Sequence, residues 1–465
     1  MKARELRNLG IPAGESVQVA LKAIGLARQG GLDMAGIRDR ICDLVTDPET
    51  YQDDPIFGEL VSAILAKQEA QSSYVPRAES APYRQWGVDL EPESVRQLEN
   101  ACTLPVAVRG ALMPDAHLGY GLPIGGVLAT RNAVIPYAVG VDIACRMKMS
   151  VLDLPLDSLT RDPGKLANAI EKETRFGIGS SFKIRREHGV MDEDWSLTAL
   201  TRQLKDKAWA QLGTSGSGNH FVEIGVIEID ANDLGLDSGQ YLALLSHSGS
   251  RGAGATIASH YSKLAMRQHP ELPKELTHLS WLDLDSEAGK EYWNSMELMG
   301  RYAAANHACI HRHVPRHLGA RVLLDLENHH NFAWSEQHDG ETVIVHRKGA
   351  TPAGAGVLGI IPGSMATTTY VARGKGNPES MNSAAHGAGR LMSRTKAKKT
   401  FSWSQVRRYL EERGVTLLSA GLDEVPMAYK DIEEVMAAQG DLVEPVARFQ
   451  PKIVKMAPPG DRPED

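Results

Sequence analysis

The chain has 465 residues with apolar and charged fractions of 42% and 23%, which is enough for one large domain or two ordinary ones. No apolar run reaches the roughly 20 residues of a membrane helix, and the sequence does not begin with the basic and then apolar segments of a secretory signal. The net charge of −7 argues weakly against nucleic-acid binding. The four cysteines (Cys42, Cys102, Cys145 and Cys309) form no CxxC pair, so we expect a cytoplasmic protein without disulfides or a membrane anchor.

The N-terminal part of the chain is predicted to be helical. Residues 16–27 and 34–44 have the apolar spacing of amphipathic helices, and glycines and prolines separate them. No pattern of residues there indicates chemistry. We therefore expect residues 1–80 to form an accessory helical region.

From residue 104 onward, short apolar strands alternate with loops rich in Gly, Pro, Asn and His. Strands are predicted at 146–154, 221–224, 241–245 and 342–345, and a long helix at 283–318. A further helix is predicted at 402–413, with Ser402 as its cap, Gln405 completing a capping box and Gly414 beyond its end. The elements do not alternate regularly, which favours an α+β fold over residues 81–457. Residues 458–465 are expected to be a disordered tail.

A carboxylate and a thiol follow the apolar segment 133–141 closely. Asp142 and Cys145 offer one hard and one soft ligand, a combination that suits Mn, Fe or Zn better than Mg. For this segment alone, a buried inert cysteine beside a turn aspartate is the simpler interpretation.

A glycine-rich loop at 213–218 leads into a predicted strand. Such a loop lets backbone N–H groups approach a ligand closely. His220 is then a candidate metal ligand and Glu223 a candidate nucleotide contact. The alternative is a glycine-rich hairpin whose histidine is satisfied within the fold.

Other polar segments lie at predicted strand ends, where function is often placed on a rigid scaffold. His247 is a candidate ligand, and Arg251 a candidate phosphate clamp because its fork matches phosphate oxygens. The segments 327–331, 346–350, 361–377 and 383–390 supply further histidines, hydroxyls and glycines. A basic stretch follows, which consists of Arg390, Arg394, Lys396, Lys398 and Lys399. Such a run of charges is usually a solvated face.

Two patterns imitate known motifs. Residues 354–359 match GxGxxG but lead into an apolar strand and not a helix, so a dinucleotide site is not expected. Two histidine pairs are spaced by four in the long helix, without the glutamate of a metalloprotease motif. We expect these to be surface histidines; they are His307 with His311, and His313 with His317.

Many segments, in one order, resemble the RtcB family of RNA-splicing ligases. They are MPDAHLGYGLPIGGV (113–127), VIPYAVGVDIAC (134–145), QLGTSGSGNHFVEIG, HSGSRGAG, HHN, HRKGAT, IIPGSMATTTYVARGKGNPES, HGAGRLMSRTKAKK, PMAYKDIEEVM (426–436) and PKIVKM. The resemblance covers about residues 105–455 and is specific because so many separate motifs agree.

The resemblance implies an α+β fold around a centre of two Mn²⁺ ions. It implies a ligase that uses GTP, carries GMP on a histidine, and joins RNA 3′-phosphate or 2′,3′-cyclic phosphate ends to 5′-hydroxyl ends. The setting would be tRNA splicing or RNA repair, and archease is a candidate activating partner.

Residue by residue, the resemblance assigns His386 as the carrier of GMP and Cys145 as the ligand that bridges both ions. Asp142 and His220 would hold one ion, and His247 and His330 the other. The nucleotide would be surrounded by Asn219, Glu223, Ser364, Thr369, Gly387, Tyr429 and Lys455. Arg251 and Arg390 would contact phosphate, and Asp115, His117 and Asn331 would support the site.

The chain departs from the usual family pattern beside these residues. Ala144 and Arg146 stand where glycines usually flank the cysteine, and Ala366 and Ser217 also replace glycines, while Thr369 stands where serine is common. No implied ligand is lost. A metal-dependent phosphoesterase that opens cyclic phosphates without ligation is the alternative enzyme, and a non-enzymatic RNA-binding protein explains the metal-type residues less well.

Overall fold

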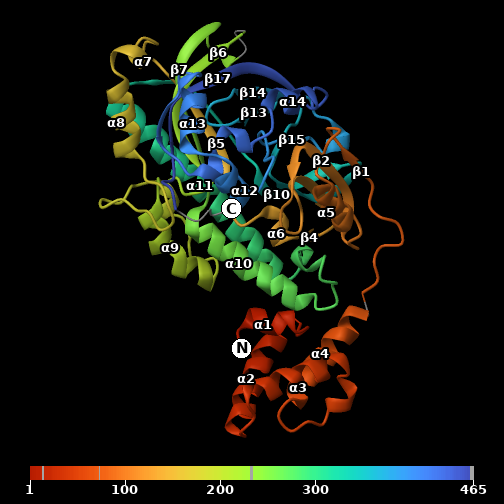
Figure 1. The fold of residues 1–465 in the computed structure, drawn as a ribbon. Coiled ribbons are helices and arrows are strands. Elements are labelled where there is room, and N and C mark those ends of the chain that lie inside the picture. The colour runs from red at the N-terminus through yellow and green to blue at the C-terminus, as the bar shows by residue number, and fades with distance from the viewer. Residues whose placement is uncertain (13–14, 73, 231–233, 461–465) are drawn as a thin grey trace. The chain divides into compact units, whose positions relative to one another are not determined.

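The computed structural model describes residues 1–12, 15–72, 74–230 and 234–460, and it divides into two compact units (Figure 1). Unit 1 comprises residues 1–76 and 267–277, and unit 2 comprises residues 77–266 and 278–465. Among the described residues, no helix has the length and apolar character to cross a bilayer.

Unit 1 is helical. Its helices are α1 (Ala3–Asn8), α2 (Glu15–Gln29), α3 (Met34–Thr46) and α4 (Gly58–Ser72), with a 3₁₀ turn at Glu49–Tyr51. The helices α2 and α3 confirm the two amphipathic segments predicted above. Asp33 caps α3 by accepting a hydrogen bond from the backbone N–H of Gly36 at 2.8 Å. The helix buries Ile37, Ile41 and Leu44, whose spacing puts them on one face.

A large mixed sheet is the centre of unit 2. Its strands follow the order β13-β14-β17-β6-β7-β5-β9, and β16 pairs in parallel with β17. The strands are β5 (Arg146–Leu152), β6 (Phe221–Ile229), β7 (Gly239–Ser248), β9 (Val322–His329), β13 (Leu358–Ile361), β14 (Thr369–Gly374), β16 (Thr416–Ser419) and β17 (Val443–Met456).

A second sheet has the order β1-β2-β3-β11-β10. Its strands are β1 (Tyr83–Gln85), β2 (Ala107–His117), β3 (Ile124–Thr130), β10 (Asn331–His338) and β11 (Glu341–Lys348). Two short pairs complete the β-structure: β4 (Ala133–Val134) with β8 (Leu282–Asp283), and β12 (Ala350–Pro352) with β15 (Ser383–Ala385).

The helices of unit 2 lie around these sheets (Figure 1). They are α5 (Pro92–Cys102), α6 (Pro136–Val139), α7 (Ser158–Arg161), α8 (Pro163–Glu173), α9 (Ala199–Gln211), α10 (Arg251–Gln268, which ends in unit 1), α11 (Glu287–Leu318), α12 (Arg394–Thr400), α13 (Trp403–Glu411) and α14 (Ile432–Ala437). The mixed order of strands and helices confirms the predicted α+β class.

The larger sheet has apolar cores on both faces. On one face, Val222, Ile224 and Leu244 pack with residues of α8 and α11, including Ile170 and Ile310. On the other face, strands β5, β6, β7, β14 and β17 contribute a separate buried cluster. Alternation along each strand sends successive side chains to opposite faces, so this arrangement requires the near-continuous apolar runs seen in the sequence.

Strand register brings the polar strand ends together. Met147 of β5 and Phe221 of β6 both pair with His247 of β7, and Arg146 pairs with His329 of β9. The residues just outside these pairs therefore share one end of the sheet. That end collects Cys145, His220 and His330, although they lie far apart in the sequence.

Several sequence predictions can be scored directly. The helix α13 begins after Ser402, whose backbone N–H donates to Gln405 Oε1 at 2.9 Å, so the predicted capping box is confirmed. The GxGxxG segment leads into β13 and not into a helix, as expected. Of the tail, Pro458–Gly460 is exposed and residues 461–465 lie outside the described residues.

The prediction of surface histidines was wrong for His307 and His311. Both are buried, because the face of α11 that carries them packs on β5 and β7. Polar residues elsewhere in α11 suggested an exposed helix, but these two rings find oxygen partners inside the fold: Ser246 Oγ lies 2.6 Å from His307 Nδ1 and 2.8 Å from His311 Nε2. His313 is half-buried and His317 is exposed.

Candidate metal and nucleotide site

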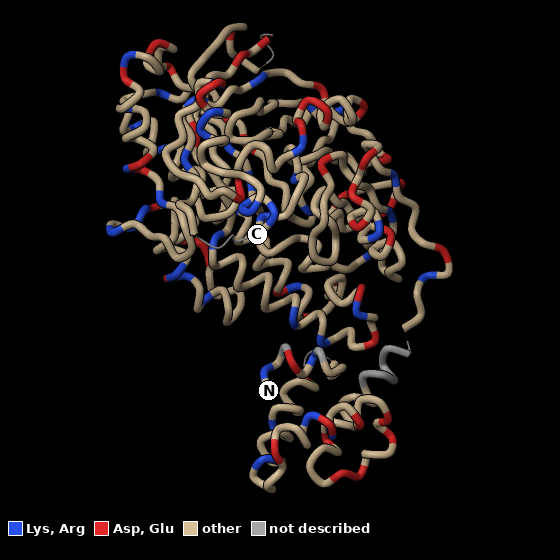
Figure 2. Tube along the Cα trace, viewed as in Figure 1, with Lys and Arg blue, Asp and Glu red and all other residues tan. Residues whose placement is uncertain are grey.

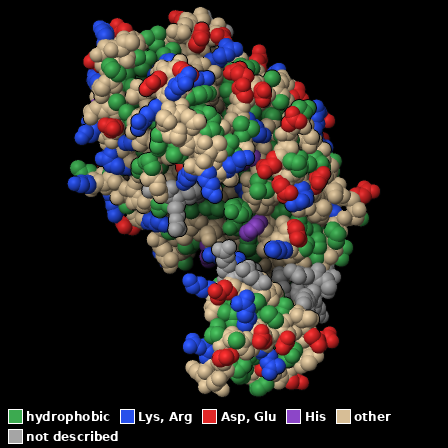
Figure 3. All heavy atoms as spheres, in the orientation of Figure 1, with side chains coloured by type: hydrophobic (Ala, Val, Ile, Leu, Met, Phe, Trp, Pro, Cys, Tyr) green, Lys and Arg blue, Asp and Glu red, His purple; other side chains and the backbone are tan. Residues whose placement is uncertain are grey.

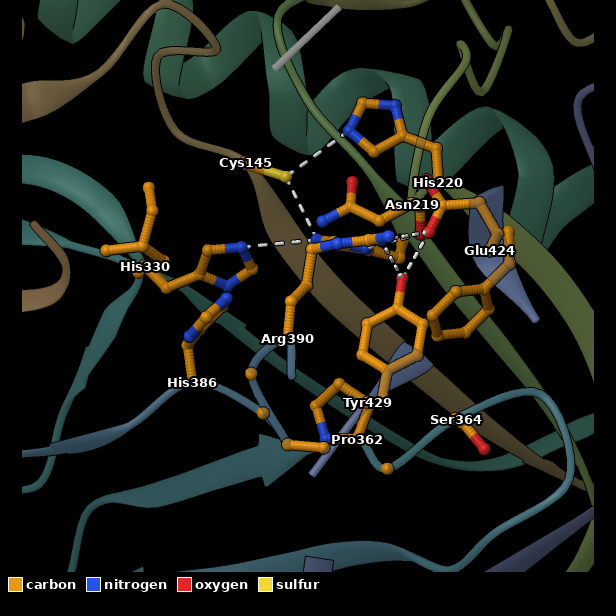
Figure 4. A pocket seen from close by; sticks show the side chains of 18 of the residues that line it. Cys145, Asn219, His220, His330, Pro362, Ser364, His386, Arg390, Glu424 and Tyr429 are labelled. Atoms are coloured by element: carbon orange, nitrogen blue, oxygen red, sulfur yellow. Dashed lines mark hydrogen bonds and ion pairs between the residues drawn. The ribbon is translucent and has the colours of Figure 1, made fainter. Parts of the chain in front are cut away.

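Five buried side chains converge at the end of the large sheet (Figure 4 shows part of this group). They form two groups of possible metal ligands that share one residue: Asp142, Cys145 and His220, and Cys145, His247 and His330. Cys145 Sγ lies 3.4 Å from His220 Nε2 and 3.0 Å from His247 Nε2. The shared thiol gives the arrangement expected of two adjacent cation sites.

The hydrogen bonds of the imidazoles indicate which nitrogen is available to a metal. Nδ1 of His220 lies 2.7 Å from the Ser215 carbonyl oxygen, and Nδ1 of His247 lies 3.1 Å from the Asn219 carbonyl oxygen. A neutral imidazole has one N–H, which these carbonyls require at Nδ1. Each Nε2 therefore presents a lone pair to the centre of the cluster.

Both Nε2 atoms face other possible ligand atoms. His247 Nε2 lies 3.2 Å from His330 Nε2, and His220 Nε2 lies 3.0 Å from Asp142 Oδ2. Such a group is unfavourable without a positive charge at its centre, and a divalent cation supplies it. Thiolate, imidazole and carboxylate together suit Mn, Fe or Zn, so the residues present fit the two-metal centre implied by the sequence.

Local electrostatics keep the ligands in their metal-binding protonation states. Burial alone would raise the pKa of Asp142, but a hydrogen bond from Nε2 of a protonated His220, with the charge of Arg251, brings it below its ordinary value. A cation bound between the two residues would take the place of that proton. Burial, together with the charge of the neighbouring His220, lowers the pKa of His247 to about 3. An ionised carboxylate and a neutral imidazole are the forms that bind metals.

The turn that carries Asp142 and Cys145 is fixed by Asn331. Its side-chain amide donates to the Asp142 carbonyl at 3.3 Å, while its Oδ1 accepts from the Gly349 N–H at 2.8 Å. Its backbone carbonyl accepts from the N–H of Ala144. Asn331 therefore holds the turn that carries these two candidate ligands.

His386 lies beside the ligand cluster, with its ring centroid 5.0 Å from that of His330. Asp115, which is fully buried, accepts from His386 Nδ1 at 2.7 Å and from the His386 and Gly387 backbone N–H groups at 3.2 and 3.3 Å. Because Nδ1 donates to the carboxylate, the lone pair of His386 is on Nε2. This is the arrangement of a nucleophilic or basic histidine oriented by an acid.

One pocket joins this cluster to the predicted nucleotide residues (Figure 4). Of the residues implied by the sequence, it is lined by Asp142, Cys145, His220, His247, His330, His386, Asn219, Glu223, Ser364, Thr369, Gly387, Tyr429, Arg390, His117 and Asn331. Burial raises the pKa of Glu223 well above its ordinary value and lowers that of His117 to about 4. The pocket therefore combines possible metal ligands, a histidine oriented by a carboxylate and polar groups at its wall.

Three of the residues implied by the sequence do not line the pocket. Arg251 is buried with Nε 3.1 Å from Thr214 Oγ1 and Nη2 3.3 Å from the Gly177 carbonyl oxygen. The ammonium of Lys455 lies 5.6 Å from the centre of the Phe176 ring. Asp115 acts behind His386, as described above.

Sequence reasoning missed Glu424. This buried carboxylate lines the pocket, accepts from Arg390 Nη1 at 3.0 Å and from the Tyr429 hydroxyl, and is ion-paired with Arg394 (Figure 4). It thus positions two of the predicted pocket residues. The only signal in the sequence was an acidic pair close to Tyr429, which has no motif character.

In the segment 346–350, Gly349 lines the pocket, whereas His346, Arg347 and Lys348 have structural roles. His346 Nε2 accepts from the Ile135 N–H at 2.9 Å, and Arg347 is bonded to Glu336 at 2.6 Å. Lys348 is buried and donates to the Tyr120 carbonyl, and burial lowers its pKa to about 7. These bonds tie β11 to its neighbours.

Comparison with known proteins identifies the family. The model for the family described as tRNA-splicing ligase RtcB matches residues 97–456. The chain belongs to the RtcB family. It is 35% identical over 398 residues to the RNA-splicing ligase RtcB of Escherichia coli (strain K12), covering 79% of this chain and 95% of that protein. It is also similar to the tRNA-splicing ligases RtcB of Nanoarchaeum equitans (34% identity; 78% and 91% covered) and Methanococcus maripaludis (31%; 80% and 92%).

The two replacements beside Cys145 have different structural consequences in this RtcB chain. Ala144 has a φ of +56°, the left-handed region in which glycine is unstrained and other residues are uncommon. Arg146 is buried, and its Nη2 lies 3.1 Å from His329 Nδ1. Ala144 therefore keeps the turn at a small cost in strain, and Arg146 points its guanidinium to β9 and not into the pocket lining.

Proposed function

We propose that this RtcB chain joins RNA 3′-phosphate or 2′,3′-cyclic phosphate ends to 5′-hydroxyl ends, using GTP and Mn²⁺, with GMP carried on His386. The observation that carries this proposal is the pair of ligand groups sharing Cys145, in one pocket with a histidine oriented by Asp115. The reaction would serve tRNA splicing or RNA repair.

The proposed ligands are Asp142 and His220 for one ion, His247 and His330 for the other, and Cys145 for both. Two divalent ions bound there would neutralise charge on the phosphates that react. Cys145 would bind as the thiolate, and the carbonyls of Ser215 and Asn219, which lie by Nδ1 of His220 and His247, would leave each Nε2 free to act as a ligand.

In the first step, the lone pair of His386 Nε2 attacks the α-phosphorus of GTP. The Nε2–P bond forms as the P–O bond to pyrophosphate breaks, and pyrophosphate leaves with that electron pair. Asp115 accepts the Nδ1–H throughout and stabilises the positive charge that develops on the ring. The resulting phosphoramidate is labile, which suits onward transfer.

In the second step, an oxygen of the RNA 3′-phosphate attacks the phosphorus of the bound GMP, and the Nε2–P bond breaks to restore His386. A cyclic phosphate is first opened by water to a 3′-phosphate. The 5′-hydroxyl of the second RNA end then attacks the activated 3′-phosphate, loses its proton and displaces GMP. Alignment of both ends in one pocket supplies much of the acceleration.

Glu223 supports guanine as the base. Burial raises the pKa of Glu223, and two N–H donors would offset this by stabilising its ionised form; guanine presents two such neighbouring groups on one edge and adenine does not. Glu223 is buried in the pocket wall, so an unmatched base would leave it unsatisfied. Asn219, Ser364, Thr369, Gly387 and Tyr429 would complete the nucleotide site, with Lys455 beside it, and Arg390 and Arg251 would contribute positive charge near phosphate.

The decisive experiment is the intact mass of the protein after incubation with GTP and Mn²⁺. The wild type should gain one GMP, the His386→Ala variant none, and the His260→Ala variant, altered at an exposed histidine of α10, the full amount. An undiminished adduct on His386→Ala would contradict the proposal. End-labelled RNA extends the test: joining of 3′-hydroxyl to 5′-phosphate ends would refute the assigned chemistry, and cyclic-phosphate opening without joining would favour the phosphoesterase alternative.

A further inference from the structure

A short stretch after His386 is strongly basic in an acidic protein. Residues 390–413 contain eight Lys and Arg and two Glu, a net charge of +6, whereas the whole chain carries −7. The remaining residues therefore carry −13. Concentration of positive charge on one local surface is typical of a site for a polyanion, even where the net charge of the protein is negative.

The cations at the outer part of this stretch are available to a ligand. Lys396 and Lys399 of α12 and Arg407 of α13 are exposed, and no ion pair within 4.0 Å joins them to an acid in the described part of the chain. Lys396 and Lys399 are three residues apart, so they lie near one another on the helix surface. Lys and Arg side chains gather over α12 and α13 in Figure 3, and the tube in Figure 2 shows the same concentration.

The inner cations of the stretch connect this surface to the pocket. Arg390 lines the pocket, and Lys398 Nζ lies 3.3 Å from Asp423 Oδ2. Arg394 is ion-paired with Glu424, which also lines the pocket. Asp423 and Glu424 thus balance the cations at the pocket wall, and the surface of cations without an acidic partner among the described residues begins beyond them, on α12.

We propose that the exposed face of α12 and α13 binds the RNA strand whose 3′-phosphate end enters the pocket. This inference rests on the proposed function and adds the path of the RNA outside the active site. Lys396, Lys399 and Arg407 contact successive backbone phosphates. The partly exposed rings of Phe401, between the two helices, and of Trp403, the first residue of α13, are available for bases to stack on.

The composition of the face favours RNA over a protein partner. Lysine is depleted in protein–protein interfaces, which depend on aromatic and other apolar anchors. Among residues 390–413, Leu391 is the one large apolar side chain that is mostly exposed, at 62%. Phosphate contacts, by contrast, are made mainly by Lys and Arg.

The test is the salt dependence of RNA binding, measured without GTP. A fluorescent single-stranded RNA with a 3′-phosphate is titrated with protein at several KCl concentrations, and anisotropy reports the association constant. Each phosphate contact on a single strand contributes about 0.7 to the slope of log K against log salt, so Lys396→Ala/Lys399→Ala should reduce the slope by about 1.4. The matched control is Lys263→Ala/Lys290→Ala, which removes two exposed lysines of α10 and α11 and should leave the slope unchanged.

The outcomes separate this inference from the proposed function. GMP adduct formation should be equal in the wild type and in Lys396→Ala/Lys399→Ala, which also shows that the variant is folded. Arg407→Ala, on the other helix, should reduce the slope by about 0.7. An unchanged slope in both variants would show that this face does not bind RNA and would overturn the inference. If the wild-type protein takes up no GMP but the variants show the predicted changes in slope, only the proposed function is overturned.

Discussion

Two groups of buried histidines lie on opposite sides of β7, and their hydrogen bonds differ. In the pocket, backbone carbonyls hold Nδ1 of His220 and His247, so both Nε2 atoms face other ligand atoms. Under α11, both ring nitrogens of His307 and of His311 have oxygen partners. Burial and residue type are the same in both groups. The partner of the second ring nitrogen is what distinguishes the candidate metal site from the structural network.

His386 extends this comparison to a third environment. Its Nδ1 is held by the carboxylate of Asp115 and not by a carbonyl or hydroxyl. A carboxylate stabilises the positive charge that a reacting imidazole acquires, which a neutral oxygen does less well. Histidines bonded to a carbonyl, a hydroxyl or a carboxylate should therefore respond differently to substitution.

The largest effect is expected at Cys145, because it belongs to both ligand groups. The Cys145→Ala variant should lose more than about 100-fold in Mn²⁺ affinity, since even residues that merely support ligands cost 10–100-fold. Metal analysis after dialysis measures this. Cys309→Ala, at an equally buried cysteine of α11, is the control and should retain the metal. Full metal content in Cys145→Ala would remove the distinction between the two groups.

The next effect concerns the orientation of His386. In Asp115→Asn, the amide can donate to Nδ1 and move the ring hydrogen to Nε2, which removes the attacking lone pair. The rate of GMP adduct formation should fall by up to about 10⁴-fold, the loss known for the equivalent change in a catalytic triad. Single-turnover mass spectrometry measures it, and Mn²⁺ content should stay constant. Asp339→Asn, at an exposed aspartate, should react normally; an equal rate in Asp115→Asn would show that the carboxylate is dispensable.

A smaller effect is expected in the structural network. The His311→Ala variant leaves the buried hydroxyls of Ser150 and Ser246 without their shared partner, which should lower the free energy of unfolding by about 1–3 kcal/mol. Urea unfolding of the metal-free protein measures this. His313→Ala, half-buried on the same helix, should change it by less than about 0.5 kcal/mol. Loss of bound Mn²⁺ in His311→Ala without loss of stability would contradict a structural role.

The smallest effect is the pH dependence of that same stability. Burial lowers the pKa of His311 well below its ordinary value, so the unfolded chain binds its proton first as pH falls. The free energy of unfolding should therefore decrease as the pH falls below about 6.5, and His311 should account for up to about 1.4 kcal/mol per pH unit of this decrease. Urea unfolding at pH 7.5, 6.5 and 5.5 should show a shallower decline in His311→Ala than in the wild type. Equal slopes would mean that His311 does not remain neutral in the fold.

The sequence alone determined the local elements and the family. The capping box at Ser402, the long helix ending at Leu318 and the strand after the GxGxxG segment depend on neighbouring residues, and these were predicted correctly. The ordered motifs identified the residues of the pocket because they also agree in type and spacing with the RtcB family. Local patterns carry this information since helix caps and periodicities involve residues a few positions apart.

Only the tertiary structure decided which histidines share a site. His307 and His311 could not be told from surface residues, because their partners Ser150 and Ser246 lie on strands distant in the sequence. Glu424 was missed for the same reason, since its role depends on its contacts with Arg390 and Tyr429. Strand register fixes these contacts, and register is set by the packing of the whole sheet and not by any one segment. A histidine's chemistry follows from the atoms at both ring nitrogens, and only the folded chain supplies them.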